Sequence, residues 1–253
     1  MTALRRRLPL RRALFLALVA ILVAMLFIVA FRARALVRTS PVFDPPVLAG
    51  QMVSCTAGFY ARRDTTIVLT ISGHCYDRAS PPQDAAGRPI GSYGAEARRA
   101  DCPAGRTCAG SDIVELVLVP DRIPWGHLNL VDLGPGGYRT LAPGARPLAC
   151  PDLHEGAAVE TDGRGIYRSG RILSVAPYAF ETDTIFPCMA LTDLDAAVGD
   201  SGAPILIDGR PAGIAAREFG GKLGFTALAE GLADLGLELC TDPNCGLDPE
   251  AYR

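Results

Sequence analysis

The chain has 253 residues, a formal charge of −2 at pH 7 and 49% hydrophobic residues. The near-neutral charge argues against a nucleic-acid partner, since proteins that bind nucleic acid present a marked excess of Lys and Arg. The length is sufficient for one large domain or two small ones after an apolar N-terminal segment.

That N-terminal segment, residues 13–31, contains no polar side chain. As a helix it would extend roughly 28 Å, about the thickness of the hydrocarbon core of a bilayer. More arginines precede it than follow it. This favours a membrane anchor over residues 1–38, with an Arg-rich tip in the cytoplasm and the rest of the chain outside. A cleavable signal peptide is the alternative, with Ala33-Arg34-Ala35 as the cleavage sequence. Both interpretations place the remaining chain outside the cytoplasm.

Eight cysteines follow this segment. An even number of cysteines in an exported domain indicates disulfides, although spacing alone does not fix the partners. Zinc is the other use of clustered cysteines, but the chain has no C-x₂-C pair, and Cys240 and Cys245 have no nearby His. We therefore expect no metal site and no cofactor.

The order of elements predicts an all-β protein. A Pro-rich linker at 39–50 precedes short apolar runs separated by Gly, Pro and Asp, typical of antiparallel barrels or sandwiches. The strand-like runs lie at residues 65–71, 113–119, 157–160, 166–175, 188–191, 204–207 and 212–216. Residues 226–237 have the apolar spacing of one amphipathic helix. A Gly- and Pro-rich connection separates two expected units, giving the divisions 51–132, 133–148, 149–238 and a tail at 239–253.

The sequence Gly199-Asp200-Ser201-Gly202 presents a serine between glycines. Glycine permits a backbone in which the amides of Gly199 and Ser201 converge on one oxygen, as an oxyanion hole requires. A Gly-rich turn without chemistry is the alternative interpretation. We expect Ser201 to be a nucleophile, which needs a general base within hydrogen-bond reach.

His74, in Gly73-His74-Cys75 at the end of a predicted strand, is the candidate base, whereas His127 and His154 lie in expected loops. The base in turn needs an acceptor that orients it. Asp112 leads directly into an apolar strand and is the candidate, with Asp101 and Asp121 as competitors.

The order His, Asp, Ser and these three motifs resemble the chymotrypsin/trypsin-like serine protease family, over roughly residues 50–238. The resemblance implies two six-stranded antiparallel β-barrels and a C-terminal helix, with the site between the barrels. It also implies four disulfides: Cys55–Cys75, Cys150–Cys188, Cys102–Cys108 and Cys240–Cys245.

The resemblance places Asp195, six residues before the serine, at the base of the specificity pocket, where a carboxylate selects Arg or Lys. Ala216, Arg217 and Glu218 replace the family's usual Ser-Trp-Gly in the strand that lines this pocket. In these positions Glu218 would block the pocket entrance, and Arg217 would neutralise Asp195 from inside.

In trypsin-like zymogens the Asp before the serine, which is Asp200 in this chain, pairs with a newly cut N-terminus. No sequence typical of such a terminus occurs between residues 38 and 55. A buried Asp200 therefore requires an internal cation. We expect Arg146 to supply it, so that no proteolytic activation is needed.

Together these features predict an exported serine endopeptidase that acts on protein or peptide substrates through an acyl-enzyme. A catalytically silent protein of the same fold, which binds peptides or partner proteins at the cell envelope, is the second hypothesis. An esterase on another fold is disfavoured by the order of the motifs.

Overall fold

The computed structural model describes residues 46–252 apart from 54, 77–78, 98–107 and 181–183. The expected membrane segment, residues 13–31, lies outside this part of the chain. No helix within the described residues is long and apolar enough to cross a bilayer.

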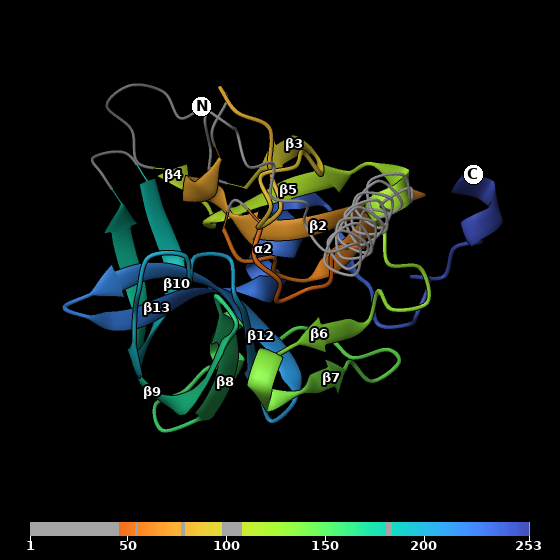
Figure 1. Cartoon of the computed structure of the whole chain (residues 1–253). Helices are drawn as coiled ribbons and strands as arrows, with labels where there is room; N and C mark the ends of the chain where they lie inside the picture. The colour runs from red at the N-terminus through yellow and green to blue at the C-terminus, as the bar shows by residue number, and fades with distance from the viewer. Residues whose placement is uncertain (1–45, 54, 77–78, 98–107, 181–183, 253) are drawn as a thin grey trace, which may run out of the picture. The chain divides into compact units, whose positions relative to one another are not determined.

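Six strands from the second half of the chain form a closed antiparallel barrel, at the lower left of Figure 1. Their order is β13-β12-β11-β8-β9-β10, and β13 also pairs with β10, which closes the ring. They are β8 (Ala158–Gly163), β9 (Ile166–Phe180), β10 (Thr184–Asp195), β11 (Pro204–Ile207), β12 (Arg210–Phe219) and β13 (Lys222–Ala227). The short strand β4 (Cys108–Ala109) adds to β10 in parallel.

Four strands from the first half of the chain and one strand near its end form a second sheet rather than the predicted six-stranded barrel. The order of its five strands is β14-β1-β2-β5-β3, and among the described residues its two edge strands do not pair with each other. The prediction of a second closed barrel was wrong because residues 46–59 form isolated bridges instead of a strand. The strands are β1 (Tyr60–Arg63), β2 (Thr66–Ser72), β3 (Gly91–Glu96), β5 (Ile113–Leu118) and β14 (Glu238–Leu239).

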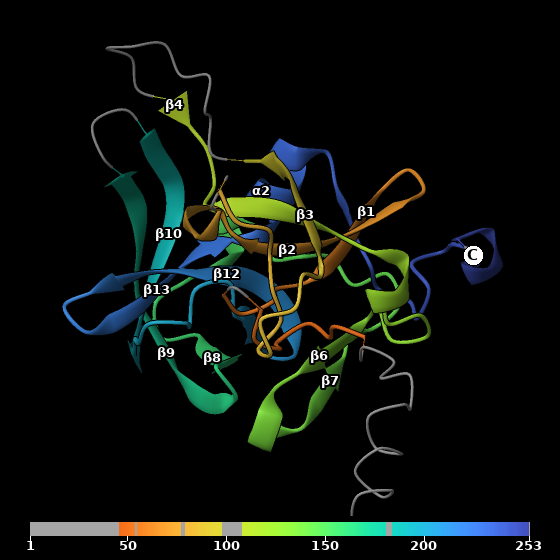
Figure 2. The ribbon, with the colours of Figure 1, turned by 45° about the horizontal axis from the view of Figure 1, so that its top comes forward.

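The connection between the two sheets contains a small hairpin of β6 (Leu130–Asp132) and β7 (Tyr138–Thr140), visible below the second sheet in Figure 2. Short 3₁₀ helices lie in the segments between strands and after the last strand. These are η1 (Gly73–Cys75), η2 (Pro120–Arg122), η3 (Gly134–Gly136), η4 (Cys150–Asp152) and η5 (Pro249–Tyr252).

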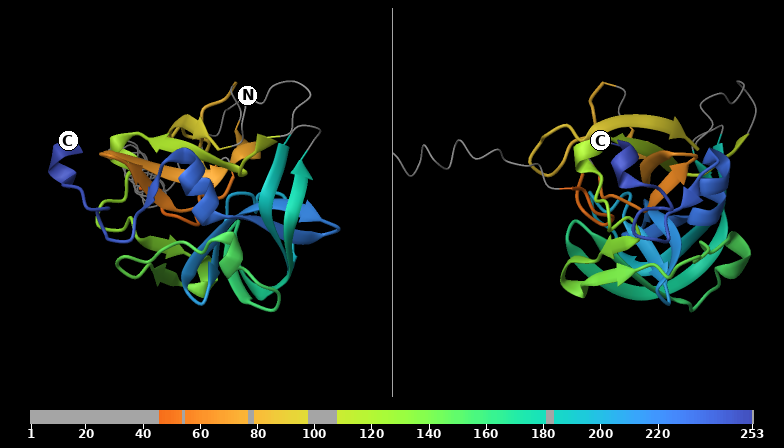
Figure 3. Two further views of the ribbon diagram at one scale, coloured as in Figure 1. Left: turned by 180° about the vertical axis from the view of Figure 1, so that it is seen from behind. Right: turned by 90° about the vertical axis from the view of Figure 1, so that its right-hand side faces the viewer.

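The helix α2 (Leu228–Leu235) lies within the predicted range 226–237 and is shorter than it. It buries Leu228, Leu232 and Leu235, which belong to the apolar core of the five-stranded sheet. Gly236 ends it in the left-handed conformation, with φ at 63°. In the rear view of Figure 3, α2 and the chain that follows it lie beside this sheet, so the C-terminal segment helps to build the first core.

Each sheet has its own core, made mainly by β-branched, leucine and alanine side chains. β2 (TIVLTIS) and β5 (IVELVL) supply buried residues to the first core. The second core fills the barrel and includes Val159, Ile172, Ile205 and Phe225. A loop that connects the two sheets is therefore anchored in a packed core at each end.

A buried ion pair joins the loop after β2 to the segment after β5. The Arg122 side chain is 3% exposed, and its Nη2 lies 2.9 Å from Asp84 Oδ2. Burial of Asp84 raises its pKa, but hydrogen bonds from Arg88, Arg122 and the backbone of Ala86 outweigh burial and hold the pKa well below its usual range. The folded chain therefore releases this proton more readily than the unfolded chain.

We expect Asp84→Asn to lower the free energy of unfolding by about 2–3 kcal/mol at pH 7, because Arg122 loses its buried counter-charge. Ionised Asp84 contributes fully above the unfolded-state pKa of about 4, and this contribution is lost as the pH falls below it. The gap between variant and wild type should therefore shrink from pH 7 to pH 3 in urea unfolding. Asp121→Asn, at an exposed neighbour, is the control, and a gap unchanged at pH 3 would contradict the assignment.

Candidate active site

His74 lies in η1, immediately after β2 ends. The disulfide between Cys55 and Cys75 ties the next residue to the chain before β1. Gly73 leaves room for the acidic partner of His74, since a Cβ there would lie 3.0 Å from Asp112 Oδ1. The strand end, the disulfide and this glycine thus fix the position of the imidazole.

Asp112 is fully buried just before β5, the strand that pairs with β2. Its Oδ2 lies 2.6 Å from His74 Nδ1, and its Oδ1 accepts the backbone N–H of His74 at 2.9 Å. A carboxylate only accepts, so the neutral ring carries its proton on Nδ1 and leaves Nε2 as an acceptor. The competing Asp121 is exposed in η2, and Asp101 lies outside the described residues.

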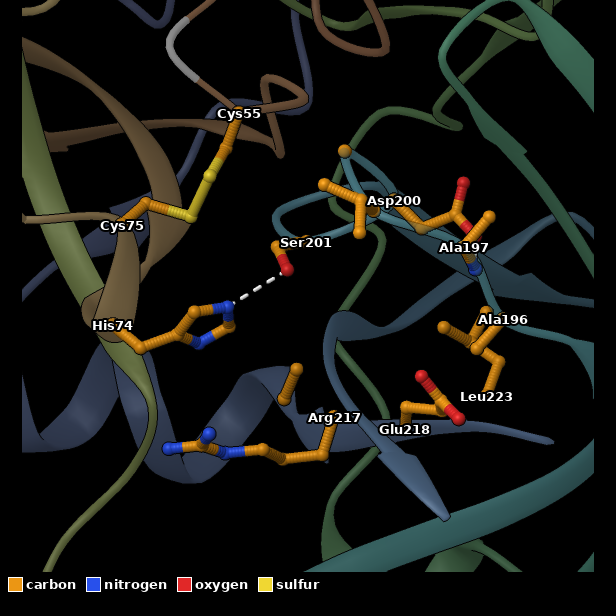
Figure 4. A pocket seen from close by; sticks show the side chains of 13 residues that line it. Cys55, His74, Cys75, Ala196, Ala197, Asp200, Ser201, Arg217, Glu218 and Leu223 are labelled. Carbon is orange, nitrogen blue, oxygen red and sulfur yellow. Dashed lines mark hydrogen bonds between the residues drawn. A yellow bond between two sulfur atoms is a disulfide. The ribbon is translucent and has the colours of Figure 1, made fainter. Parts of the chain in front are cut away.

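Ser201 Oγ lies 2.7 Å from His74 Nε2, the interaction drawn as a dashed line in Figure 4. The structure therefore brings Asp112, His74 and Ser201 into one hydrogen-bonded chain, with the first two from one sheet and the third from the barrel side. His127 and His154 are exposed elsewhere. This arrangement is suited to removing a proton from the serine hydroxyl.

The loop that carries Ser201 requires glycine on both sides. Gly199 has φ at +96° and Gly202 at +90°, and a Cβ on Gly202 would lie 2.0 Å from the carbonyl oxygen of Thr56. Thr56 is a residue that sequence reasoning missed. Its Oγ1 donates to the Gly199 carbonyl at 2.7 Å, and its N–H donates to the Ser201 carbonyl at 2.8 Å. Two carbonyls of the loop are thus held by the segment that precedes the first sheet.

The amides of Gly199 and Ser201 remain available in this loop. Neither N–H donates to a protein acceptor among the described residues, whereas the amides of Asp200 and Gly202 are bound to backbone carbonyls. Two free amides beside a candidate nucleophile are the components of an anion-binding site.

The carboxylate of Asp200 is buried under this loop, and its counter-charge is Arg168 on β9. Arg168 Nη1 donates to Asp200 Oδ2 at 2.8 Å, and Arg168 Nη2 lies 2.8 Å from Oδ1. The amide of Ala197 also donates to Oδ2, and Arg164 Nε lies 3.6 Å from Oδ1. The prediction of an internal cation is met, but its assignment to Arg146 was wrong, because Arg146 is exposed and makes no ion pair with Asp200.

A cavity of about 390 Å³ opens beside Ser201 and His74. Ala196, Ala197, Ala216 and Leu223 give it apolar walls, and Glu218 lines it as well. Figure 4 shows Ala196, Glu218 and Leu223 around the space below Ser201.

Asp195 does not lie at the base of this cavity, contrary to the expectation. Its side chain is 88% exposed, and its Oδ1 lies 2.8 Å from Lys222 Nζ, an ion pair that lowers the pKa of Asp195. Lys222, rather than Arg217, is its cation. The register explains the difference, because Asp195 pairs with Lys222 at the open end of the β10–β13 ladder.

Three of the predicted disulfides are present: Cys55–Cys75, Cys150–Cys188 and Cys240–Cys245. Cys102 lies outside the described residues, so the Cys102–Cys108 pair stays a prediction. Within the described part of the chain, no group of three His, Cys, Asp or Glu side chains is placed to hold a metal ion.

No protein-family model and no curated protein sequence matches this chain. Solved structures do match. A glutamic acid specific serine protease has a TM-score of 0.59 at 19% identity, and 76% of this chain covers all of that one. Protease A of Thermobifida fusca has a TM-score of 0.54 at 22% identity, with coverage of 78% and 98%.

The chymotrypsin of Cellulomonas bogoriensis has a TM-score of 0.57 at 19% identity, and 78% of this chain covers all of that enzyme. The chain has the trypsin-like serine protease fold. At these identities the trypsin-like resemblance rests on the fold, and the roles of individual residues rest on the geometry above.

The ion pair of Asp200 predicts different effects for two arginines. Arg168→Gln should lower the free energy of unfolding by about 3 kcal/mol, because Asp200 stays buried without its counter-charge. Arg146→Gln, at the exposed position, is the matched control and should change it by less than about 0.5 kcal/mol. Denaturant unfolding of both variants is the measurement. Equal stabilities would contradict the assignment of Arg168.

Proposed function

We propose that this chain is a serine endopeptidase that hydrolyses peptide bonds through Asp112, His74 and Ser201. The single observation that carries the proposal is the continuous hydrogen-bonded chain, with 2.6 Å between Asp112 and His74 and 2.7 Å between His74 and Ser201. An isolated serine near a histidine is common, but a buried third group that orients the histidine is the arrangement that nucleophilic catalysis requires.

In the first half of the proposed reaction, Ser201 Oγ attacks the carbonyl carbon of the substrate while His74 Nε2 takes the hydroxyl proton. The oxyanion is bound by the amides of Gly199 and Ser201. The C–N bond then breaks, and His74 transfers that proton to the departing amine, which leaves an acyl ester on Ser201.

In the second half, water attacks the ester as His74 takes its proton. The C–O bond to Ser201 breaks, the proton returns to Ser201 Oγ, and the carboxylic acid is released. Asp112 stabilises the imidazolium that forms in each half and is not itself protonated.

An extended polypeptide fits the backbone next to the cavity. β12 pairs with β11 from Arg210 to Ile214 and continues beyond that ladder as an edge on which Ala216 and Glu218 line the cavity. A substrate segment can add to such an edge through main-chain hydrogen bonds. This favours a protein or peptide substrate over a small ester.

One similar structure is described as a glutamic acid specific protease that uses a histidine triad in substrate binding. This chain has three histidines in all. His127 and His154 are exposed and do not line the cavity, and His74 is the proposed base. Selection of glutamate by histidines therefore receives no support here.

We also propose that the chain acts outside the cytoplasm. The three disulfides of the described residues support this, because disulfides persist in oxidising compartments. The apolar segment at 13–31, as an anchor or a signal peptide, would provide the route.

The full-length chain should react covalently with a fluorophosphonate probe, and Ser201→Ala should abolish this labelling, because the probe needs an activated serine and an oxyanion hole. Asp112→Asn should reduce the rate of peptide hydrolysis by about 10⁴-fold with the fold retained, since it favours the wrong tautomer of His74. Mass spectrometry would locate the adduct. A folded, oxidised wild-type chain that stays unlabelled would favour a catalytically silent protein of the same fold that binds peptides.

A further inference from the structure

The cavity beside Ser201 is lined by two carboxylates that differ in their freedom to bind a ligand. Asp200 is 1% exposed and already paired with Arg168. Glu218 lies on β12 at the cavity wall, and its Oε1 accepts only the backbone N–H of Gly221 at 3.1 Å. Within the described residues, no Lys or Arg side chain forms an ion pair with Glu218. Glu218 is thus the acid in this cavity that can receive a cation.

Arg217 and Glu218 point in opposite directions, as neighbouring residues on a strand do. In Figure 4 the Arg217 side chain extends beneath His74, whereas the Glu218 carboxylate lies beside Ala196 and Leu223. The two charges therefore line different parts of the same cavity.

The remaining walls suit the stem of a long side chain. Ala196, Ala197 and Ala216 leave the cavity open beside Ser201, and the buried side chain of Leu223 lines it further in. A lysine or arginine packs its methylene groups on apolar surface while its charged end seeks an acceptor. An acidic side chain would meet the Glu218 carboxylate, and a small one would leave the cavity unfilled.

We propose that Glu218 is the specificity-determining residue of this site, and that it binds the ammonium or guanidinium of a Lys or Arg immediately before the cleaved bond. The inference rests on the proposed protease function. It replaces Asp195, which lies outside the cavity, with an exposed carboxylate on the cavity wall. The acid thus reaches the substrate from the wall of the cavity.

The test compares full-length wild type, Glu218→Gln and Asp195→Asn on peptide amides with Lys, Arg, norleucine, Ala or Glu before the cleaved bond. Norleucine is close to lysine in shape and lacks its charge. The measured quantity is the ratio of kcat/KM for Lys to that for norleucine, which does not depend on the fraction of correctly folded enzyme.

Wild type should favour Lys over norleucine, and Glu218→Gln should lower that ratio by about tenfold to a hundredfold, the usual worth of a charge-assisted hydrogen bond. Asp195→Asn should leave the ratio unchanged, because that carboxylate is outside the cavity. Glu218→Lys should shift preference towards Glu. These four results together support the inference.

A fall in the ratio with Asp195→Asn and none with Glu218→Gln would overturn it, as would a wild type that cleaves best after Ala, norleucine or Glu. Fluorophosphonate labelling of wild type separates this failure from failure of the proposed function. A labelled enzyme with another preference refutes the role of Glu218 alone, whereas an unlabelled one refutes both.

Discussion

The buried carboxylate of Asp200 sets the conformation of the loop on which the site depends. A charge beneath the surface requires a cation of its own, and Arg168 supplies it from a barrel strand. With Asp200 held, the amides of Gly199 and Ser201 donate to no acceptor among the described residues. The counter-charge of Asp200 comes from within the same chain.

The site also depends on contact between the two sheets. His74 and Asp112 come from strands of the open sheet, and Ser201 comes from the loop before β11 of the barrel. Thr56 joins them by hydrogen bonds to the carbonyls of Gly199 and Ser201. Buried Ser72 adds a second link, since its hydroxyl donates to the Ala215 carbonyl at 2.6 Å. These hydrogen bonds pair a donor of the open sheet or its preceding segment with an acceptor of the barrel, so they hold residues from distant parts of the sequence together.

Sequence reasoning succeeded where chemistry constrains a short stretch of residues. A serine between glycines, a histidine at a strand end and an aspartate before an apolar strand are local patterns, and the structure brings all three together. The same reasoning failed where partners are set by strand register. Asp195 is six residues from Ser201, yet its pairing with Lys222 at the end of a ladder carries it outside the cavity.

Arg168 shows the same limit. Nothing in its local sequence marks it as the partner of Asp200, because the contact arises from the β8–β9 hairpin beside the serine loop. The family resemblance likewise implied that the first sheet is a closed barrel within residues 51–132. One of its strands lies instead at 238–239. Contacts between distant segments leave no periodic signal in a single sequence.

The strand β14 has a consequence for the order of folding. It pairs Leu239 with Ala61, so the edge of β1 stays open until synthesis has passed residue 239. Leu228, Leu232 and Leu235 of α2, which belong to the same core, also follow the other strands of this sheet in the sequence. A chain whose synthesis has not passed these residues therefore lacks part of the core of the sheet that positions His74.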